Sequence, residues 1–366
     1  MRKQTVDYLF LFSVMALTAI GSIMVFSASP TMAVKLGDSY YFLKRHIFYV
    51  LLGFAALMFG LRLSLQKLQK WSILIFSMSI VLLLLVFIPG LGKQISGSLR
   101  WLDLAFFSFQ PSEVVKFTTV LFLAALLAKM GDRIKDFYRG LLPVLALVGI
   151  ICGIIIAQPD LGTAIAIGAT AFMMLFAAGA NHWHLLGLGV VSIMGAISLA
   201  FSSAYRLRRI VAFLNPWQDP QGVGFHIIQS LLAVGSGGFL GKGLGASKQK
   251  FFYLPQQFTD FIFAILCEEL GFLGGAGVVA LFILFTTRGL RIAYMAGGGF
   301  ESNLAAGLVA WLTLQALINI LVVVGLIPTT GIPLPFISYG GTATIINLFA
   351  VGIVLNISGH ITGAKK

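Results

Sequence analysis

The sequence predicts an all-α integral membrane protein, a bundle of about ten transmembrane helices with one large extracytoplasmic loop. Hydrophobic residues make up 58% of the 366 and charged residues only 10%, and the mean hydropathy is +0.97. A soluble domain carries about a quarter charged residues. Only helices and closed β-barrels satisfy their backbone hydrogen bonds inside lipid. The apolar runs of this chain lack the alternation of polar and apolar residues that barrel strands show, so helices are predicted.

A spanning helix needs about 20 apolar residues, and runs of roughly that length recur along the whole chain. Neither a clear internal repeat nor a low-complexity linker divides them, so residues 1–366 are interpreted as a single polytopic domain. The predicted spans are residues 7–26, 47–63, 72–88, 112–128, 141–157, 161–179, 185–203, 261–285, 303–326 and 339–358.

The basic residues predict the orientation in the membrane. Ten spans put both termini on one side, and 13 of the 25 Lys and Arg residues lie there. Six of the remaining twelve fall in the long loop 204–260, and long loops count weakly in the positive-inside rule. The short-loop comparison of 13 against 6 predicts cytoplasmic termini and an outward-facing loop. The net charge of +13 is explained by this topology and by anionic lipid rather than by nucleic acid.

The loop 204–260 is rich in Gly, Pro and aromatic residues, as in "NPWQDPQGVGFHIIQS" and "GSGGFLGKGLGAS". Its apolar piece 227–234 is too short to span a membrane, so it is expected to lie in the interface or to re-enter. The sequence "GSGGFLGKG" lacks the spacing of a phosphate-binding P-loop, and "GKGLGA" follows no strand. Neither is interpreted as a nucleotide site.

The stretch "LPQQFTDFIFAILCEELGF", residues 254–272, places three acids at the start of the eighth span. Asp260 suits a helix N-cap, and at a membrane boundary it also suits a base that meets a lipid-borne substrate. Glu268 lies about 12 Å deeper and about 80° around the helix, with Glu269 on the opposite side. Intramembrane acids face a cavity or a partner, so we interpret the two glutamates as supports facing the bundle.

A second group of charges, Arg100, Asp103, Glu113 and Lys116, gathers at the outer end of the fourth span. Glu113 and Lys116 are three residues apart and share a helix face. They form either a local ion pair or part of an anion site in which Arg100 and Lys116 bind the anion and Glu113 orients the lysine. The intramembrane placement favours the functional alternative.

Two further groups lie on the same predicted side. Asp160, in "AQPDLGTA", is expected mainly to cap the sixth span. Arg206, Arg208 and Arg209 follow the seventh span, and arginine forks match phosphate oxygens, although an interfacial cluster explains them equally well. The five histidines show no metal-ligand spacing. Cys152 and Cys267 fall inside predicted spans, which argues against a disulfide.

Several long motifs in order, running through nearly the whole chain, resemble the SEDS family of bacterial shape, elongation, division and sporulation proteins. They include "RWLDLAFFSFQPSEVVKF", "AQPDLGT" and "GLIPTTGIPLPFISYGG". "RIVAFLNPWQDP" and "GLGASKQKFFYLP" are closer to the FtsW/SpoVE branch than to RodA. Many relatives have an acid where this chain has Gln256 and a polar residue where it has Phe258.

The resemblance implies a peptidoglycan glycosyltransferase that polymerises lipid II outside the cytoplasmic membrane, with a class B penicillin-binding protein as transpeptidase partner. The family's essential aspartate of the outer loop falls on Asp260. Its Arg-Trp pair falls on Arg100 and Trp101, and its Gln-Pro-Ser-Glu…Lys positions fall on Glu113 and Lys116.

The expected reaction is a single displacement with inversion, in which Asp260 deprotonates an acceptor hydroxyl and cations stabilise the diphosphate leaving group. Arg100, Lys116 and Arg206 are the expected cations, and a divalent ion such as Mg²⁺ or Mn²⁺ is a further candidate. A lipid II flippase using the same charges and a non-catalytic scaffold for division proteins are the alternatives. The outward, boundary position of Asp260 favours catalysis.

Overall fold

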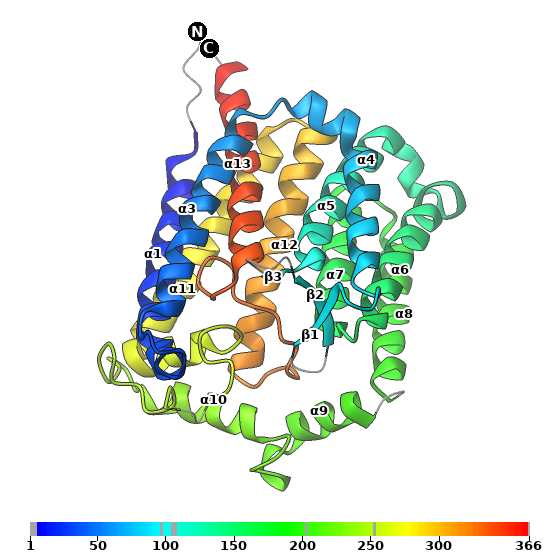
Figure 1. Cartoon of the computed structure of the whole chain (residues 1–366). Helices are drawn as coiled ribbons and strands as arrows, with labels where there is room; N and C mark the ends of the chain where they lie inside the picture. Colours follow the sequence, from blue (N-terminus) through cyan, green and yellow to red (C-terminus); the bar gives the residue numbers. More distant parts are fainter. Residues whose placement is uncertain (1–5, 96–97, 104–107, 202–203, 252–253, 365–366) are drawn as a thin grey trace.

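The computed structural model describes residues 6–95, 98–103, 108–201, 204–251 and 254–364. Within these ranges, eight helices are long and apolar enough to cross a membrane, and α7 and α8 contribute shorter apolar segments. The chain is a multi-pass helical membrane protein, and each predicted span overlaps a helix. The ten helices of the bundle (Figure 1) are α1 (Tyr8–Ala28), α3 (Tyr41–Arg62), α4 (Leu65–Leu85), α5 (Pro111–Met130), α6 (Leu142–Ala157), α7 (Leu161–Ala177), α8 (His182–Phe201), α11 (Ile262–Met295), α12 (Gly299–Val323) and α13 (Gly341–Ala364).

Several of the predicted spans were shorter than the helices in the structure. Helix α3 begins at Tyr41 rather than 47, α4 begins at Leu65 rather than 72, and α11 continues to Met295 rather than 285. The sequence prediction stopped at charged residues. Basic side chains extend from a helix end towards water while their stems stay on apolar surface, so the helices continue through them.

Short elements connect the helices. Between α4 and α5 lies a three-stranded antiparallel sheet, in which Lys93 of β1 pairs with Trp101 of β2, and Leu102 of β2 with Phe109 of β3. This sheet was not predicted from the sequence. The connecting elements are α2 (Pro30–Ala33), η1 (Val34–Leu36), β1 (Gly92–Ile95), β2 (Ser98–Asp103), β3 (Ser108–Phe109), η2 (Gly131–Lys135), η3 (Phe137–Leu141), α9 (Ala204–Leu214), η4 (Pro216–Gln218) and α10 (Phe225–Ser236).

The interior is organised around α12, which packs against α5, α7, α11 and α13 and buries Trp311. Helices α3 and α13 approach closely because small residues face each other: a Cβ on Gly352 would collide with the backbone of Leu57. Close approach at small residues is the usual way in which helices associate in lipid. The amide of Asn356 joins the same two helices, donating to the Gly60 and Leu63 carbonyls at 3.0 and 2.7 Å.

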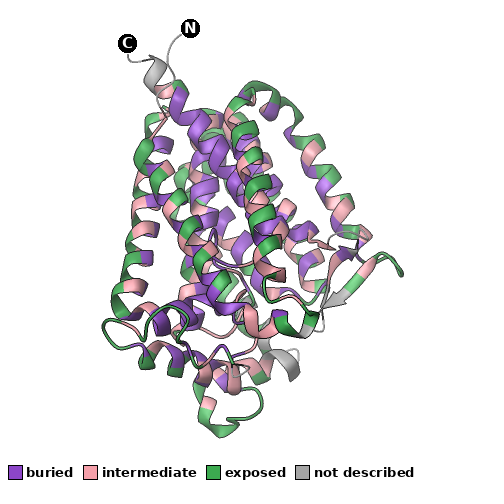
Figure 2. Ribbon diagram, turned by 60° about the vertical axis from the view of Figure 1, so that its left-hand side comes forward, coloured by how far each residue is buried: buried purple, intermediate pink, exposed green. Residues whose placement is uncertain are grey.

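The outer faces of the bundle helices are apolar. Exposed residues follow these faces while buried residues fill the interior (Figure 2). The exposed side chains include Phe59, Ile73, Val81 and Ile283, each more than half accessible. Large apolar side chains on so much of a surface are a liability in water, and they are the expected contact with lipid tails.

Both termini emerge at one end of the bundle, and α9 and α10 lie across the other end (Figure 1). The apolar piece 227–234, expected in the interface, forms the middle of α10, which packs on α11 and α12. The hydroxyl of Ser230 donates to the Val323 carbonyl at 2.7 Å. The long loop is therefore an ordered cap on this end of the bundle.

Helix α11 is interrupted at Gly271, which has φ +67° and ψ −164°. Only glycine adopts this conformation readily, and a Cβ here would collide with the backbone of Gly241. The Gly-rich loop fills the break: Lys242 N–H donates to the Glu268 carbonyl at 3.1 Å, and Phe272 N–H donates to the Gly238 carbonyl at 2.9 Å. Backbone groups freed by the break are thereby satisfied, as they must be away from water.

Candidate active site

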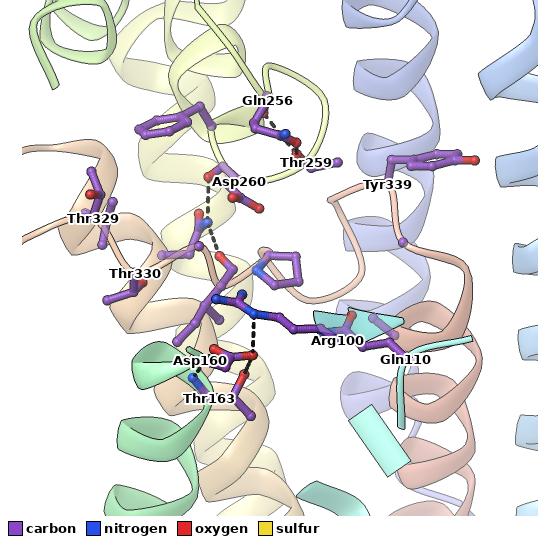
Figure 3. Close-up of a pocket in the computed structure, with 18 of the residues that line it drawn as sticks. Arg100, Gln110, Asp160, Thr163, Gln256, Thr259, Asp260, Thr329, Thr330 and Tyr339 are labelled. Atoms are coloured by element: carbon purple, nitrogen blue, oxygen red, sulfur yellow. Dashed lines mark hydrogen bonds and ion pairs between the residues drawn. The ribbon is translucent and has the colours of Figure 1, made fainter. Parts of the chain in front are cut away.

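A cavity of about 1110 Å³ lies where the capping loop meets the bundle. Its walls come from the sheet, the first turns of α5 and α7, helix α9, the loop before α11 and the loop between α12 and α13. Segments distant in the sequence thus bring their polar side chains to one place (Figure 3). Its charged lining residues are Arg45, Arg100, Glu113, Lys116, Asp160, Arg208, Arg209, Asp219 and Asp260.

Asp260 lines this cavity but does not cap α11, so that interpretation was wrong. The helix begins at Ile262, Phe261 occupies the cap position, and no side chain caps the first turn. The chain turns at Gln256, whose carbonyl accepts from Thr259 N–H and Phe261 N–H, each at 3.2 Å. Because of this turn, α11 begins two residues after Asp260. Among the described residues no group donates a hydrogen bond to the Asp260 carboxylate.

The backbone around Asp260 is held by three consecutive carbonyls. Tyr339 N–H donates to the Phe258 carbonyl at 2.9 Å, and the Ser338 hydroxyl donates to the Thr259 carbonyl at 2.6 Å. The Asn319 amide donates to the Asp260 carbonyl itself at 2.7 Å. The carboxylate therefore projects from a segment that is fixed on both α12 and the loop before α13.

Burial raises the pKa of the Asp260 carboxyl to about 6. The positive charges of Arg100 and Arg209 act in the opposite direction and lower it, while the negative charge of Asp160 adds to the increase. A carboxyl with a pKa near 6 is a stronger base than an ordinary aspartate and is still ionised at neutral pH. These are the properties that a general base needs.

Arg100 and Asp160 form one unit on the opposite wall. Asp160 caps α7, accepting from Thr163 N–H at 3.1 Å and from the Thr163 hydroxyl at 2.9 Å. Arg100 Nε lies 3.5 Å from Asp160 Oδ2, and its terminal nitrogen donates to the Pro159 carbonyl at 2.6 Å. In Figure 3 the guanidinium extends towards the space between Asp160 and Asp260. The cap expected for Asp160 is present, and it also orients Arg100.

Glu113 and Lys116 are buried at the start of α5 and bind each other at 2.7 Å. Lys116 also donates to Gln315 Oε1 at 2.9 Å and lies 5.6 Å from the centre of the Trp311 ring. This arrangement compensates the lysine charge internally. Lys116 lines the cavity, but its ammonium is already bound to the protein.

The arginine cluster of α9 reaches the cavity through Arg208 and Arg209. Arg209 donates to the Thr329 carbonyl at 2.9 Å, while Arg208 is exposed. The predicted residue Arg206 has its side chain outside the described part of the chain, as does Asp103. Trp101 lies next to Arg100 in the lining.

Glu268 and Glu269 are completely buried, and neither belongs to the described lining of the cavity. Glu268 accepts from Lys242 Nζ at 2.8 Å, and Glu269 accepts from Lys250 Nζ at 3.1 Å and from the Ser27 hydroxyl at 2.7 Å. Two lysines of the capping loop thus neutralise the pair. The glutamates fasten this loop to α11 and α1.

The cavity residues that were not predicted from the sequence include Arg45 of α3, Asp219, His226 of α10 and Asn319 of α12. Burial, together with the charge of Arg209, lowers the pKa of His226, whose ring stacks on Phe261. Asn319 did leave a signal in the sequence, because Gln315 and Asn319 are amides one turn apart in an apolar span. Buried amides in such a span need hydrogen-bond partners.

Within the described ranges, no three or more His, Cys, Asp or Glu side chains gather in a way that could hold a metal ion. Asp160 is already bound to Arg100 and Thr163. The donor set therefore does not form a protein cage for Mg²⁺ or Mn²⁺. A divalent ion here would need the phosphate oxygens of a substrate beside Asp260.

Comparisons with known proteins agree with this architecture. "Probable peptidoglycan glycosyltransferase FtsW" of Geobacter sp. (strain M18) is 44% identical over 364 residues, covering 99% of each chain. "Stage V sporulation protein E" of Bacillus subtilis (strain 168) is 45% identical over 360 residues, covering 98% of each.

Solved structures share the fold over nearly the full length. A chain from work described as "Structural coordination of polymerization and crosslinking by a peptidoglycan synthase complex" superposes with a TM-score of 0.80 at 27% identity, covering 98% of each chain. Rod shape determining protein RodA of Thermus thermophilus gives 0.72 at 27% identity, covering 97% of each. The family model for FtsW, RodA and SpoVE, described as "Cell cycle protein", matches residues 7–363. The chain therefore belongs to the FtsW/RodA/SpoVE family of cell cycle proteins.

Proposed function

We propose that this chain is a peptidoglycan glycosyltransferase that polymerises lipid II into glycan strands for cell division or sporulation. The observation that carries the proposal is the Asp260 carboxyl, whose pKa is raised to about 6 in a cavity of about 1110 Å³ that several arginines also line. The names of the similar proteins, FtsW glycosyltransferases and a sporulation protein, support the same activity.

The orientation follows from the charge bias. Basic residues are more frequent in the short segments at the end of the bundle that carries both termini, which predicts that this end is cytoplasmic. Helices α9 and α10 lie across the opposite end (Figure 1), and both contribute residues to the cavity lining. We therefore propose that the cavity opens at the outer membrane–water boundary, where the sugars of a lipid-linked substrate would reach Asp260 while its chain stays in the bilayer.

In the proposed reaction, Asp260 takes the proton from the 4-hydroxyl of one lipid II disaccharide. The resulting oxygen attacks the anomeric carbon of a second glycan, and the bond from that carbon to the lipid diphosphate breaks. The diphosphate leaves with the electron pair, and the configuration at the anomeric carbon inverts. One base suffices, because no covalent enzyme intermediate forms.

The departing diphosphate gains one negative charge, on the oxygen of the broken bond, and this charge must be stabilised in place. Arg100, Arg208 and Arg209 line the cavity, and guanidinium groups bind phosphate oxygens in a bidentate fashion. Lys116 is assigned a different part, because Glu113 and Gln315 already engage its ammonium. We assign it to shaping the cavity wall beside the substrate.

The proposed partner is a class B penicillin-binding protein, which would crosslink the strands as they form. A peptidoglycan synthase complex contains a chain with the same fold. The decisive experiment supplies labelled lipid II to the purified protein bound to such a partner with its transpeptidase inactivated. We expect glycan strands on a gel. If no strands form and labelled lipid II instead crosses liposome membranes, the protein is a flippase and the proposal fails.

The rate of polymerisation is expected to depend on pH through Asp260. Its pKa lies near 6, so the carboxyl is protonated and inactive below that value and ionised above it. The rate should therefore rise between about pH 5 and 7 and level off above, rather than rise near pH 4 as for an ordinary carboxyl. Initial rates measured across pH 4.5–8 test this. A rate that had already levelled off at the lower end of this range, as for a carboxyl with a pKa near 4, would contradict the assigned base.

A further inference from the structure

Helix α12 presents two buried amides, Gln315 and Asn319, to the loop between α12 and α13. Each uses its NH₂ group to bind a backbone carbonyl of that loop. Gln315 donates to the Pro333 carbonyl at 3.1 Å, and Asn319 donates to the neighbouring Ile332 carbonyl at 2.8 Å. The two side chains hold consecutive carbonyls from positions one helical turn apart.

Asn319 makes a second bond that Gln315 lacks. Its other N–H donates to the Asp260 carbonyl at 2.7 Å. One planar amide therefore clamps the segment carrying the carboxylate to the loop on the facing wall of the cavity. Because both acceptors are carbonyl oxygens, the nitrogen must face them, and this fixes the orientation of the amide.

The oxygen of the same amide has no hydrogen-bond partner within the part of the chain that the structure describes. Asn319 Oδ1 is buried without one, although the residue belongs to the cavity lining. In Gln315 the corresponding oxygen accepts from Lys116 at 2.9 Å and from the Trp311 indole at 3.1 Å. An unpaired buried acceptor is unfavourable, and a donor group on a bound ligand would satisfy it.

We infer that Asn319 is a positioning residue for Asp260 and that its Oδ1 accepts a hydrogen bond from a sugar hydroxyl or acetamido N–H of the substrate. The inference rests on the proposed glycosyl transfer and adds a residue to it. Asn319 holds the backbone that aims the base. A displacement of about 1 Å at a reacting group lowers the rate by about a hundredfold, so this bond matters for turnover.

Two substitutions separate the two contacts. Asn319→Asp keeps an acceptor oxygen but removes both donors and adds a negative charge near Asp260. We expect kcat to fall about tenfold or more with KM little changed, and the acid limb set by Asp260 to move up by about one pH unit through like-charge repulsion. Arg100, Arg209 and Asp160 also act on that carboxyl and are unchanged. Asn319→Leu removes the acceptor too, so KM should also rise about fivefold or more.

Asn356→Asp is the matched control, because Asn356 is another buried amide that donates to two carbonyls, those of Gly60 and Leu63. It lies outside the described cavity lining, so this variant should keep the wild-type acid limb. If Asn319→Asp retains wild-type kcat and acid limb, the positioning role is wrong. If Asn319→Leu retains the wild-type KM, the substrate contact is wrong.

Two further results keep the test decisive. If Asn319→Asp does not purify as folded protein, Asn319→Ala replaces it, since it removes both amide donors without adding charge or a new donor. A kcat equal to wild type would then overturn the inference. Wild-type protein that makes no glycan refutes the proposed function itself, a result obtained before any Asn319 variant is measured.

Discussion

Asp260→Asn is expected to lower the rate of lipid II polymerisation by about 10²–10⁴-fold, the usual contribution of a general base. The substitution preserves the size of the side chain and removes its capacity to take a proton. The surrounding bonds should persist, because Asn319, Ser338 and Tyr339 bind backbone carbonyls rather than this side chain. The measurement is the initial rate of glycan formation in complex with the transpeptidase-inactivated partner.

Asp38→Asn provides the control. Asp38 lies between η1 and α3 and pairs with Lys44 at 2.8 Å, outside the described cavity lining. Its loss should leave the rate near wild type. An Asp260→Asn protein that makes strands as fast as Asp38→Asn would show that another group takes the proton.

Lys250→Met is expected to lower the free energy of unfolding by about 3–5 kcal/mol, the cost of leaving one charge of a buried pair without its partner. Glu269 is completely inaccessible and Lys250 is 8% exposed at the side chain. After the substitution, the partners of the carboxylate among the described residues are the Ser27 hydroxyl and the Ser247 N–H. Denaturant titration in detergent measures the loss.

The double variant Lys250→Met/Glu269→Gln tests the cause. Removing both charges should restore most of the stability, because no buried charge is then unpaired. Lys44→Met, which breaks the exposed pair with Asp38, is the comparison and should change stability little. If Lys250→Met is no more harmful than Lys44→Met, the buried pair does not hold the capping loop.

Much of the helical bundle could be predicted, because a long apolar run has few alternatives in a membrane. The sheet was missed since its strands are short and, within the described ranges, pair with each other alone. The break at Gly271 was also missed, because the apolar pattern continues through it. What interrupts the helix is the backbone of residues 237–243, which folds back from earlier in the chain.

The candidate site, like the fold, was predicted only in part from the sequence. Asp260 and Arg100 were identified because charged residues are conspicuous at the ends of apolar spans. The partners of Glu268 and Glu269 could not be identified from the sequence. They are Lys242 and Lys250, which lie 26 and 19 residues away across a Gly-rich loop. Periodicity relates residues only within one helix. Asn319 was overlooked because a neutral amide is hard to distinguish from the packing around it.

The way in which Asp260 is held has an evolutionary consequence. Residues 258–260 are gripped through three main-chain oxygens, and every amino acid supplies the same oxygen. Side chains beside the base are therefore free to diverge while the base stays in place. Neither the Gln256 side chain nor the Phe258 side chain takes part in these three bonds. Substitutions beside Asp260 should alter what the cavity admits before they alter how the proton is removed.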